Sequence, residues 1–324
     1  MIVTATDNQE YETSGGLFFL YFLLLFLTAV AGPSYTASAQ SITFLDAPSP
    51  EKIAITPGGV DIRTGRLAYT RTDLSIGEGS GALALERMMA TSIRGHVAPF
   101  GNLSHNWDVT LWIKPVPLSQ YPGRHDYIAN VNYGARSQTF EMLYLQETAF
   151  SQKSQNDYTR LTTPGTAGAL GAVYTYRATD GTMAVFRPMA NGQCISAAFS
   201  SQCANVSYII EPDGTRFDFE YETTTSSVAN KTRLRSVTSS RGFALLFEYG
   251  SGGASWNHVS KACVLNLGSV AKPANNQCPA TTLGTTTYTY TTLDSRIVIA
   301  SATVPGSTAE NFGYARRLQI KPSR

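Results

Sequence analysis

No group of side chains in this 324-residue sequence has the spacing of a known catalytic motif. The four histidines are His96, His105, His125 and His258. Ser104 directly precedes His105, and these are the residue types of a nucleophile and its base. Neighbouring residues on a strand point to opposite faces of the sheet, so their adjacency argues against a Ser–His dyad. We interpret His105 as a hydrogen-bonded turn histidine.

Two pairs of carboxylates have the residue types that glycoside hydrolysis uses. They are Asp213 with Asp218, and Glu211 with Glu220. Carboxylates beside Asp-Gly turns are ordinary turn chemistry, which is the interpretation we favour. The sequence also contains neither a G-x-S-x-G nor an H-E-x-x-H motif. We therefore predict no catalytic residues, no enzymatic activity and no cofactor.

The four cysteines form two closely spaced pairs. Cys194 and Cys203 bracket one short polar loop, and Cys263 and Cys278 bracket another. Four cysteines permit three pairings, and proximity favours Cys194–Cys203 and Cys263–Cys278. A zinc site would need C-x2-C spacing or nearby histidines, and only His258 lies near either pair. The sequence therefore predicts two loop-stapling disulfides and no metal site.

A stretch rich in aromatic residues could bind a ligand. Its members are Trp107, Trp112, Tyr121, Tyr127 and Tyr133. Exposed Trp and Tyr beside Asn and Asp can stack on sugar rings, which makes these residues candidate carbohydrate-binding positions. The alternative, which we favour, is that these aromatic residues face the core of a sheet.

The elements that would position these residues are strands. Only 15% of the residues are charged, while Thr, Ser, Gly, Asn and 17 Tyr are abundant, and these types suit strand faces and tight turns. Residues 66–90, 174–186, 208–221 and 234–249 each read as strand, turn, strand, with apolar residues at alternate positions. The predicted fold class is all-β, built of antiparallel hairpins. A net charge of +2 is too small to indicate a nucleic-acid partner.

The N-terminal region has the features of a secretory leader. Residues 17–30 are uncharged and strongly apolar, and Ala37-Ser38-Ala39 follows as a small-x-small cleavage site. The first 16 residues contain no Lys or Arg, so an uncleaved anchor is the alternative, and it would be the only membrane contact. We predict a signal peptide over 1–39, a linker or arm over 40–59, and a secreted or cell-surface protein.

Residues 58–92 and 99–111 resemble the opening domain of RHS/YD-repeat proteins. The elements that carry the resemblance are Asp61, Thr64-Gly65, Thr72-Asp73-Leu74-Ser75, Leu85-Glu86-Arg87, Phe100-Gly101 and Ser104-His105-Asn106-Trp107-Asp108. Residues 174–186, 208–221 and 233–250 look like degenerate strand–turn units that lead into the family's YD repeats. Leu103 stands where the family usually has a Gly-Trp pair, and no unit shows a clean Tyr-Asp followed by Gly-Arg.

The resemblance implies a β-sheet that spirals into a hollow shell. On this basis 60–160 would be an N-terminal RHS-associated β domain and 161–324 a series of YD-repeat-like units. The implied function is that of a non-catalytic exported scaffold whose partner is the remainder of an RHS-type shell, which in this family can enclose a toxin. The alternative is a free-standing module that binds a cell-surface glycan. The chain would then be either the front of a longer protein or a short member of the family.

Overall fold

The computed structural model describes residues 69–89, 97–121, 123, 125–133, 136–143, 149–152, 158–164, 173–189, 202–226, 232–251 and 253–314. The chain divides into two compact units, 1–43 and 44–324, and every described residue belongs to the second. The predicted leader, the linker, His96 and Cys194 lie outside the described residues. Within the described residues, no helix is both long enough and apolar enough to cross a membrane.

A small antiparallel sheet contains the first part of the described chain. Its strands, in spatial order, are β1 (Thr70–Ile76), β2 (Leu83–Met89) and β3 (Leu103–His105). A short 3-10 turn, η2 (Gly79–Gly81), joins β1 to β2 and completes the hairpin that the sequence predicts here. The glycine-rich run Gly77–Gly81 is therefore a strand connection.

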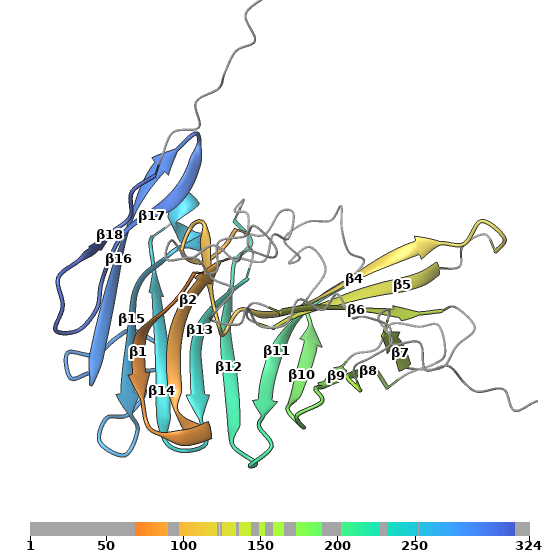
Figure 1. Ribbon diagram of the computed structural model, residues 1–324, viewed down its shortest axis with the longest axis horizontal. Helices are drawn as coiled ribbons and strands as arrows, with labels where there is room; N and C mark the ends of the chain where they lie inside the picture. The colour runs from red at the N-terminus through yellow and green to blue at the C-terminus, as the bar shows by residue number, and fades with distance from the viewer. Residues whose placement is uncertain are drawn as a thin grey trace, which may run out of the picture. The chain divides into compact units, whose positions relative to one another are not determined.

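A second sheet contains the remaining fifteen strands, all paired antiparallel to their neighbours (Figure 1). The first eight are β4 (Val109–Pro117), β5 (His125–Tyr133), β6 (Arg136–Met142), β7 (Ala149–Gln152), β8 (Arg160–Thr162), β9 (Tyr174–Arg177), β10 (Met183–Pro188) and β11 (Gln202–Ile210). The next seven are β12 (Arg216–Thr223), β13 (Thr232–Ser239), β14 (Phe243–Tyr249), β15 (Val259–Asn266), β16 (Gly284–Leu293), β17 (Arg296–Thr303) and β18 (Glu310–Asn311). The short 3-10 helix η3 (Gly253–Asn257) precedes β15. The all-β prediction is confirmed, and the hollow spiral stays a prediction.

Strands β4 to β11 close into a ring of eight strands. Strand β10 pairs with β9 on one edge and with β11 on the other, while β11 pairs with β4. Contacts across the interior accompany this closure: the rings of Phe140 on β6 and Tyr176 on β9 lie 6.2 Å apart. The Tyr176 hydroxyl also donates to Gln138 Oε1 at 2.6 Å. Since β7 and β8 separate these strands in the sheet order, the contacts cross the inside of the ring.

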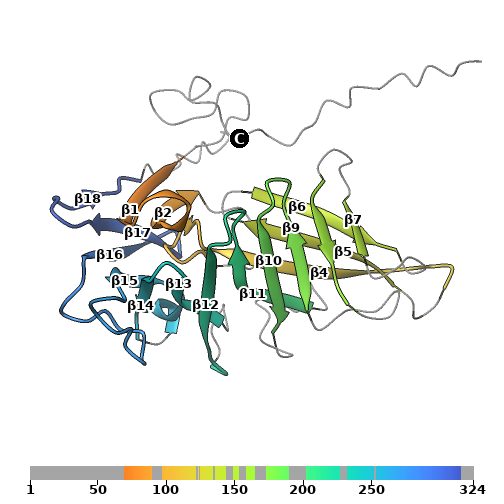
Figure 2. The same cartoon turned by 90° about the horizontal axis from the view of Figure 1, so that it is seen from below.

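The large sheet divides at β11. One edge of β11 pairs with β10, and two strands share its other edge: residues 202–205 pair with β4, and residues 208–210 pair with β12. From this point, which we call the fork, β12 leads into the open part of the sheet, β12–β18. Figure 2 shows β11 between the ring strands and β12.

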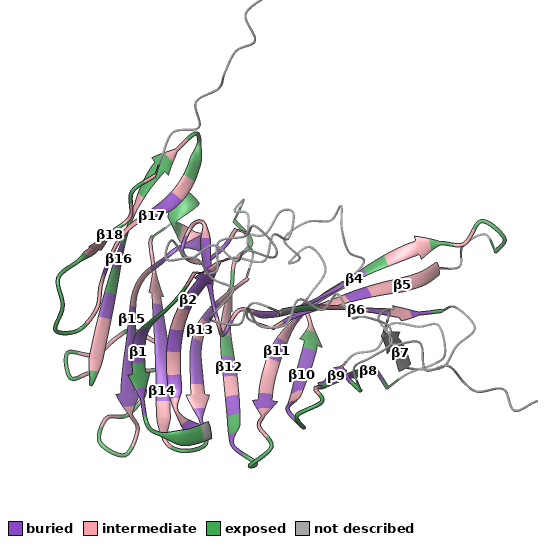
Figure 3. Ribbon diagram, in the orientation of Figure 1, coloured by how far each residue is buried: buried purple, intermediate pink, exposed green. Residues whose placement is uncertain are grey.

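The small sheet lies against one face of the open part. Strand β1 contacts β15 and β16, and β2 contacts β14. The core between the two layers contains Leu85, Phe100, Phe217, Phe247 and Tyr288, all of which are buried. Buried residues are correspondingly dense along β2 and β13–β15 (Figure 3).

The opposite face of β14 and β15 has its own apolar cluster. Its buried members are Ala244, Leu246, Cys263 and Leu265, and Leu267, Val270 and Cys278 pack against them. Residues 267–283, which we call the strap, cross this cluster between β15 and β16. The strap is attached by the Cys263–Cys278 disulfide and by a 2.6 Å hydrogen bond from the Cys278 amide to Glu248 Oε1. The predicted Cys263–Cys278 bond is confirmed.

Candidate functional site: the junction of the two sheets

The described motif residues that carry the family resemblance meet where the small sheet docks on the large one, while Asp61, Thr64 and Gly65 lie outside the described residues. We call this region the junction; it contains Asp73, Arg87, Gly101, Asn102 and residues 104–108. They come from β1, β2, β3 and the two connections that flank β3. The strand pairing of β1 with β2 and of β2 with β3 brings them together.

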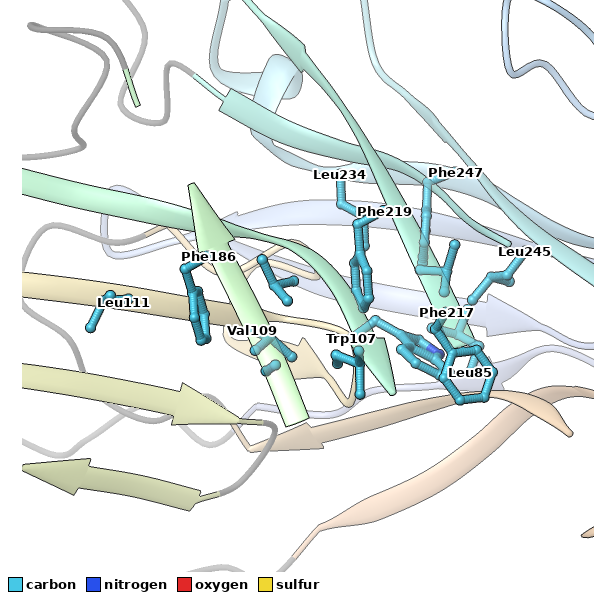
Figure 4. Close-up of a cluster of buried hydrophobic side chains, with 14 of the residues drawn as sticks. Leu85, Trp107, Val109, Leu111, Phe186, Phe217, Phe219, Leu234, Leu245 and Phe247 are labelled. Atoms are coloured by element: carbon cyan, nitrogen blue, oxygen red, sulfur yellow. The ribbon is translucent and has the colours of Figure 1, made fainter. Parts of the chain in front are cut away.

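Trp107 fills the wedge at the fork. Its ring lies 5.1 Å from that of Phe217 and 5.9 Å from that of Phe219, both on β12. Figure 4 shows it between Val109 and Phe186 of the ring and the aromatic residues of β12. Its indole Nε1 donates to the carbonyl oxygen of Ala84 at 2.7 Å, so the buried polar atom of this side chain is satisfied. Trp107 therefore joins the ring, the open sheet and β2.

Asn106 continues the pairing of β2 beyond the end of β3. Its backbone amide donates to Glu86 O at 3.1 Å, and its side-chain Oδ1 accepts from the Glu86 amide at 3.0 Å. The same side chain donates through Nδ2 to Ala84 O at 2.9 Å. An amide side chain at this position can offer both a donor and an acceptor, which explains why Asn suits it.

The Ser104–His105 pair does not form a dyad. Ser104 Oγ donates to Asp108 Oδ2 at 2.5 Å, and His105 Nδ1 accepts from the Trp107 amide at 3.1 Å. The buried imidazole is stacked on Phe247, with ring centres 5.1 Å apart, and meets the edge of Phe100. These contacts are those of the hydrogen-bonded turn histidine that the sequence predicts.

Asp73 and Arg87 form a fully buried ion pair. Arg87 Nε donates to Asp73 Oδ2 at 2.5 Å and Nη2 donates to Oδ1 at 2.8 Å, and neither side chain is exposed. Tyr288 on β16 adds a hydroxyl hydrogen bond to Asp73 Oδ2 at 2.7 Å. Burial disfavours the charged guanidinium, but the hydrogen bonds and negative charge of Asp73 outweigh it and raise the pKa of Arg87. Removing one partner from such a pair typically costs about 3–5 kcal/mol, because the other charge is left buried.

Gly101 allows the β3 connection to approach β17 closely. Its φ of +76° lies in the left-handed region, where a side chain is strained. A Cβ at this position would also lie 2.8 Å from Ile297 O and 2.9 Å from Val298 Cα. Asn102 follows and accepts, through Oδ1, a 3.4 Å hydrogen bond from the amide of Ile299. The Phe100-Gly101 motif thus docks on the backbone of β17.

The aromatic residues proposed for sugar binding do not form one exposed surface. Trp107 and Trp112 are 8% and 7% exposed, and Tyr127 is half-buried against the core. Tyr121 is 50% exposed in the connection between β4 and β5. The structure therefore buries both tryptophans, as expected for core residues, and leaves Tyr121 accessible. Carbohydrate binding stays a prediction.

The paired carboxylates lie in turns and ion pairs. Asp213 accepts from the Thr215 amide at 2.9 Å and pairs with Arg241 at 3.1 Å. Glu211 accepts from Thr182 Oγ1 at 3.1 Å, and its pKa is raised, chiefly by burial.

The other member of each acidic pair binds a cation. Asp218 pairs with Arg216 at 2.6 Å, and Glu220 pairs with Lys272 of the strap. Burial alone would raise the pKa of Glu220, but hydrogen bonds from Lys272 and Asn276 lower it. No group of three or more His, Cys, Asp or Glu side chains in the described ranges could hold a metal ion.

The second predicted disulfide falls partly outside the described chain. Cys203 on β11 is disulfide-bonded. Cys194, its predicted partner, lies outside the described residues.

The sequence did not indicate that Glu310, which lies on β18, belongs to the junction. Glu310 accepts from Arg87 Nη2 at 2.8 Å, across a separation of 223 residues. The signal that could have found it is the alternation of Glu310, Phe312 and Tyr314, which is typical of a strand with one face covered.

No protein-family model matches the chain, and no curated protein matches it. Among solved structures, the N-terminal domain of the effector protein SpvB from Salmonella typhimurium strain LT2 aligns with a TM-score of 0.46 at 12% identity, covering 76% of this chain and 100% of that one. A Photorhabdus luminescens Tc holotoxin pore aligns with a TM-score of 0.44 at 12% identity, covering 80% of this chain and 16% of that one. A TcdB2–TccC3 complex aligns with a TM-score of 0.37 at 9% identity, covering 71% of this chain and 14% of that one. This chain thus spans about a sixth of the Tc toxin chains or less, and all three TM-scores lie below 0.5.

Proposed function

We propose that this protein is a non-catalytic, exported scaffold that forms part of a β-shell built together with a larger RHS-type protein. One observation carries the proposal: the described motif residues that resemble the RHS family join the two sheets to each other. Asp73 and Arg87 are buried in an ion pair, Trp107 fills the fork, and Gly101 is pressed against β17. These contacts give the motif residues a structural role, which is to hold the two sheets together.

The open part of the large sheet provides the means of association. Strand β17 has eight residues, but β18 pairs with it only through Ser301 and Ala302. An edge strand presents backbone donors and acceptors to which another strand can pair. A sheet that is closed into a ring at one end and ends in a short strand at the other is suited to extension in one direction.

Export is supported by the leader and by the disulfide. Residues 1–39 have the order of a signal peptide, and Cys263–Cys278 is a bond of the kind that persists in oxidising compartments. In the described residues the bond holds the strap against the outer face of β14 and β15. It would stabilise the scaffold in the environment into which the protein is secreted.

The test is the intact mass of the native secreted product, measured with and without reduction and alkylation. We expect these peptides in a polypeptide much larger than 35.0 kDa, or in a stable complex with one. A free product that spans only residues 40–324 and has no partner in size-exclusion chromatography would contradict the scaffold. Alkylation of Cys263 and Cys278 before reduction would contradict the oxidised state.

A second candidate function is a glycan-binding module, and the exposure of Tyr121 favours it. This side chain extends from the connection between β4 and β5, where it could stack on a sugar ring. A glycan array would show saturable binding that Tyr121→Ala abolishes. The matched control is Tyr158→Ala, which removes another exposed tyrosine outside this connection. Equal loss of binding in both variants would contradict a site at Tyr121.

A further inference from the structure

The segment Glu310–Tyr314, which we call the closing segment, covers the end of the large sheet. Its residues alternate strictly: Glu310, Phe312 and Tyr314 are half-buried, while Asn311 and Gly313 are exposed. The preceding residues, 305–309, are all exposed. Such a period-two pattern is that of an extended strand with one face against the protein. The closing segment therefore docks through three side chains at alternate positions.

Glu310 occupies the first of three subsites, which is basic. Its Oε2 accepts from Arg87 Nη2 at 2.8 Å, and its Oε1 accepts from Arg71 Nη1 at 3.2 Å. Arg87 is fully buried, and Asp73 already pairs with its Nε and Nη2. One guanidinium thus binds one carboxylate from its own sheet and one from the closing segment. Charge-assisted bonds of this kind are stronger than neutral ones and specific for a carboxylate.

Phe312 occupies the second subsite, which is aromatic and cationic. The Arg87 guanidinium carbon lies 5.2 Å from the centre of the Phe312 ring. The Tyr69 ring meets Phe312 edge-on, with ring centres 6.2 Å apart and an interplanar angle of 71°. The backbone amide of Phe312 donates to Ala300 O on β17 at 2.9 Å. This subsite favours an aromatic side chain, through cation–π attraction and edge-to-face packing.

Tyr314 occupies the third subsite, at the edge of β17 itself. Its hydroxyl donates to Ile299 O at 2.6 Å and lies 3.2 Å from Asn102 Oδ1. Asn102 Oδ1 in turn accepts from the Ile299 amide. The backbone of Ile299, at the edge of β17 with which another strand could pair, therefore hydrogen bonds to the side chains of Tyr314 and Asn102.

The surface that binds the closing segment, which we call the groove, is formed by β17, Arg87 and Asn102. It offers more hydrogen-bonding capacity than the closing segment uses. Arg87 Nη1 and the Tyr69 hydroxyl are buried beside Phe312, and neither has a hydrogen-bond partner among the described residues. Strand β18 pairs with β17 through two residues, Glu310 and Asn311. A buried donor without a partner is costly, so an occupant with additional acceptors would bind more favourably than the closing segment does.

We propose that the groove formed by β17, Arg87 and Asn102 is a docking site for an extended segment of the larger shell protein. The chemistry of the three subsites requires a carboxylate, an aromatic ring and a tyrosine at alternate positions. The closing segment is the occupant supplied by the chain itself, and it protects the groove until the partner strand displaces it. The inference rests on the proposed scaffold function and adds to it the chemistry of the partner.

The test uses the full chain and a fluorescently labelled peptide with the sequence of residues 305–314. In wild-type protein the closing segment competes, so fluorescence anisotropy should show weak binding. The chain variant Glu310→Gln/Phe312→Ala weakens this competitor, and we expect it to bind the same peptide roughly tenfold more tightly. The chain variant Asn311→Ala, whose altered side chain is exposed, should keep the wild-type affinity.

The specificity of the groove is tested with a second peptide, which carries Glu310→Gln. It should bind the double variant roughly tenfold more weakly than the first peptide, because it lacks the carboxylate for Arg87. Equal affinity of the two peptides, or equal affinity of the wild-type and variant chains, would overturn the proposal. If the double variant does not fold, hydrogen exchange on the wild-type chain decides. Saturating peptide should then speed exchange at the Phe312 amide, and unchanged exchange would overturn the proposal.

The peptide experiment tests the groove and the mass measurement tests the scaffold function, so either proposal can fail without the other. A groove that does not bind the peptide would leave the scaffold intact but remove its docking chemistry. A free secreted product that nevertheless binds the peptide through Arg87 would remove the shell and leave the groove.

Discussion

Replacing Gly101 by alanine tests whether the motif residues lock the two sheets together. The substitution combines two costs. At φ +76°, alanine is forced into the left-handed region, which costs roughly 1–2 kcal/mol. The new Cβ would also lie 2.8 Å from Ile297 O and 2.9 Å from Val298 Cα, both of which are backbone atoms. Ordinary contacts between carbon atoms are about 3.5–4 Å long, so the connection or β17 must move.

The expected loss is larger than strain alone can produce. Forcing extra volume into a packed contact costs typically about 1–3 kcal/mol, so Gly101→Ala should lower the free energy of unfolding by roughly 2–5 kcal/mol in total. Gly214→Ala is the matched control. Gly214 has nearly the same φ, +83°, but a Cβ placed there would have no atom of the described residues within 4 Å. The control should lose only the strain, roughly 1–2 kcal/mol.

The assay is urea denaturation followed by tryptophan fluorescence, because Trp107 and Trp112 are both buried and Trp107 lies at the fork. The difference between the two variants isolates the close approach of Gly101 to β17. If both variants lose the same free energy within about 0.5 kcal/mol, no such approach exists and the docking of the motif on β17 is wrong. A Gly101→Ala variant as stable as wild type would also contradict the positive φ.

Three further predictions follow from other parts of the structure. Removing the strap disulfide with Cys263→Ala/Cys278→Ala should lower the free energy of unfolding by about 3 kcal/mol in urea titrations, and an unchanged value would mean that the strap needs no covalent bond. Burial lowers the pKa of His258 in the folded protein, so its contribution to stability is complete above about pH 6.5 and is lost as the pH falls through the lowered pKa. His258→Gln should therefore flatten the plot of unfolding free energy against pH below about pH 6.5, and a variant with the wild-type slope would refute this assignment. Trp107→Ala should cost about 3–5 kcal/mol in thermal or urea unfolding and Tyr121→Ala less than about 0.5 kcal/mol; equal losses would contradict their burial.

The sequence predicted the local features of the fold because they depend on a few neighbouring residues. The turns at Gly181, Gly214 and Gly242 have positive φ values of +94°, +83° and +86° and connect the strands that the alternating pattern indicates. Asp-Gly turns and period-two alternation act over fewer than ten residues, so no distant contact is needed to recognise them. The same holds for Cys263–Cys278, where short separation favoured one of three pairings.

The sequence could not predict which strands meet across long separations. The pairing of β10 with β11 closes the ring. Nothing in the sequence of β11 indicates that it pairs with β10 as well as with β4 and β12. The burial of Trp107 depends on the fork, which exists only because two strands share one edge of β11. An aromatic residue beside Asn and Asp has the same sequence pattern whether it faces a sugar or a core.

By itself the sequence determined an all-β chain with hairpins at defined positions, a stapled loop at Cys263–Cys278 and the motif elements between Thr72 and Asp108. Local propensities and turn chemistry contain this information. Only the tertiary structure decided what the motif does, because the contact of Arg87 with Glu310 spans 223 residues, and that of Tyr288 with Asp73 spans 215. Such contacts form because polar and charged groups that are buried away from water need hydrogen-bond partners, and only the packing of the two sheets supplies them.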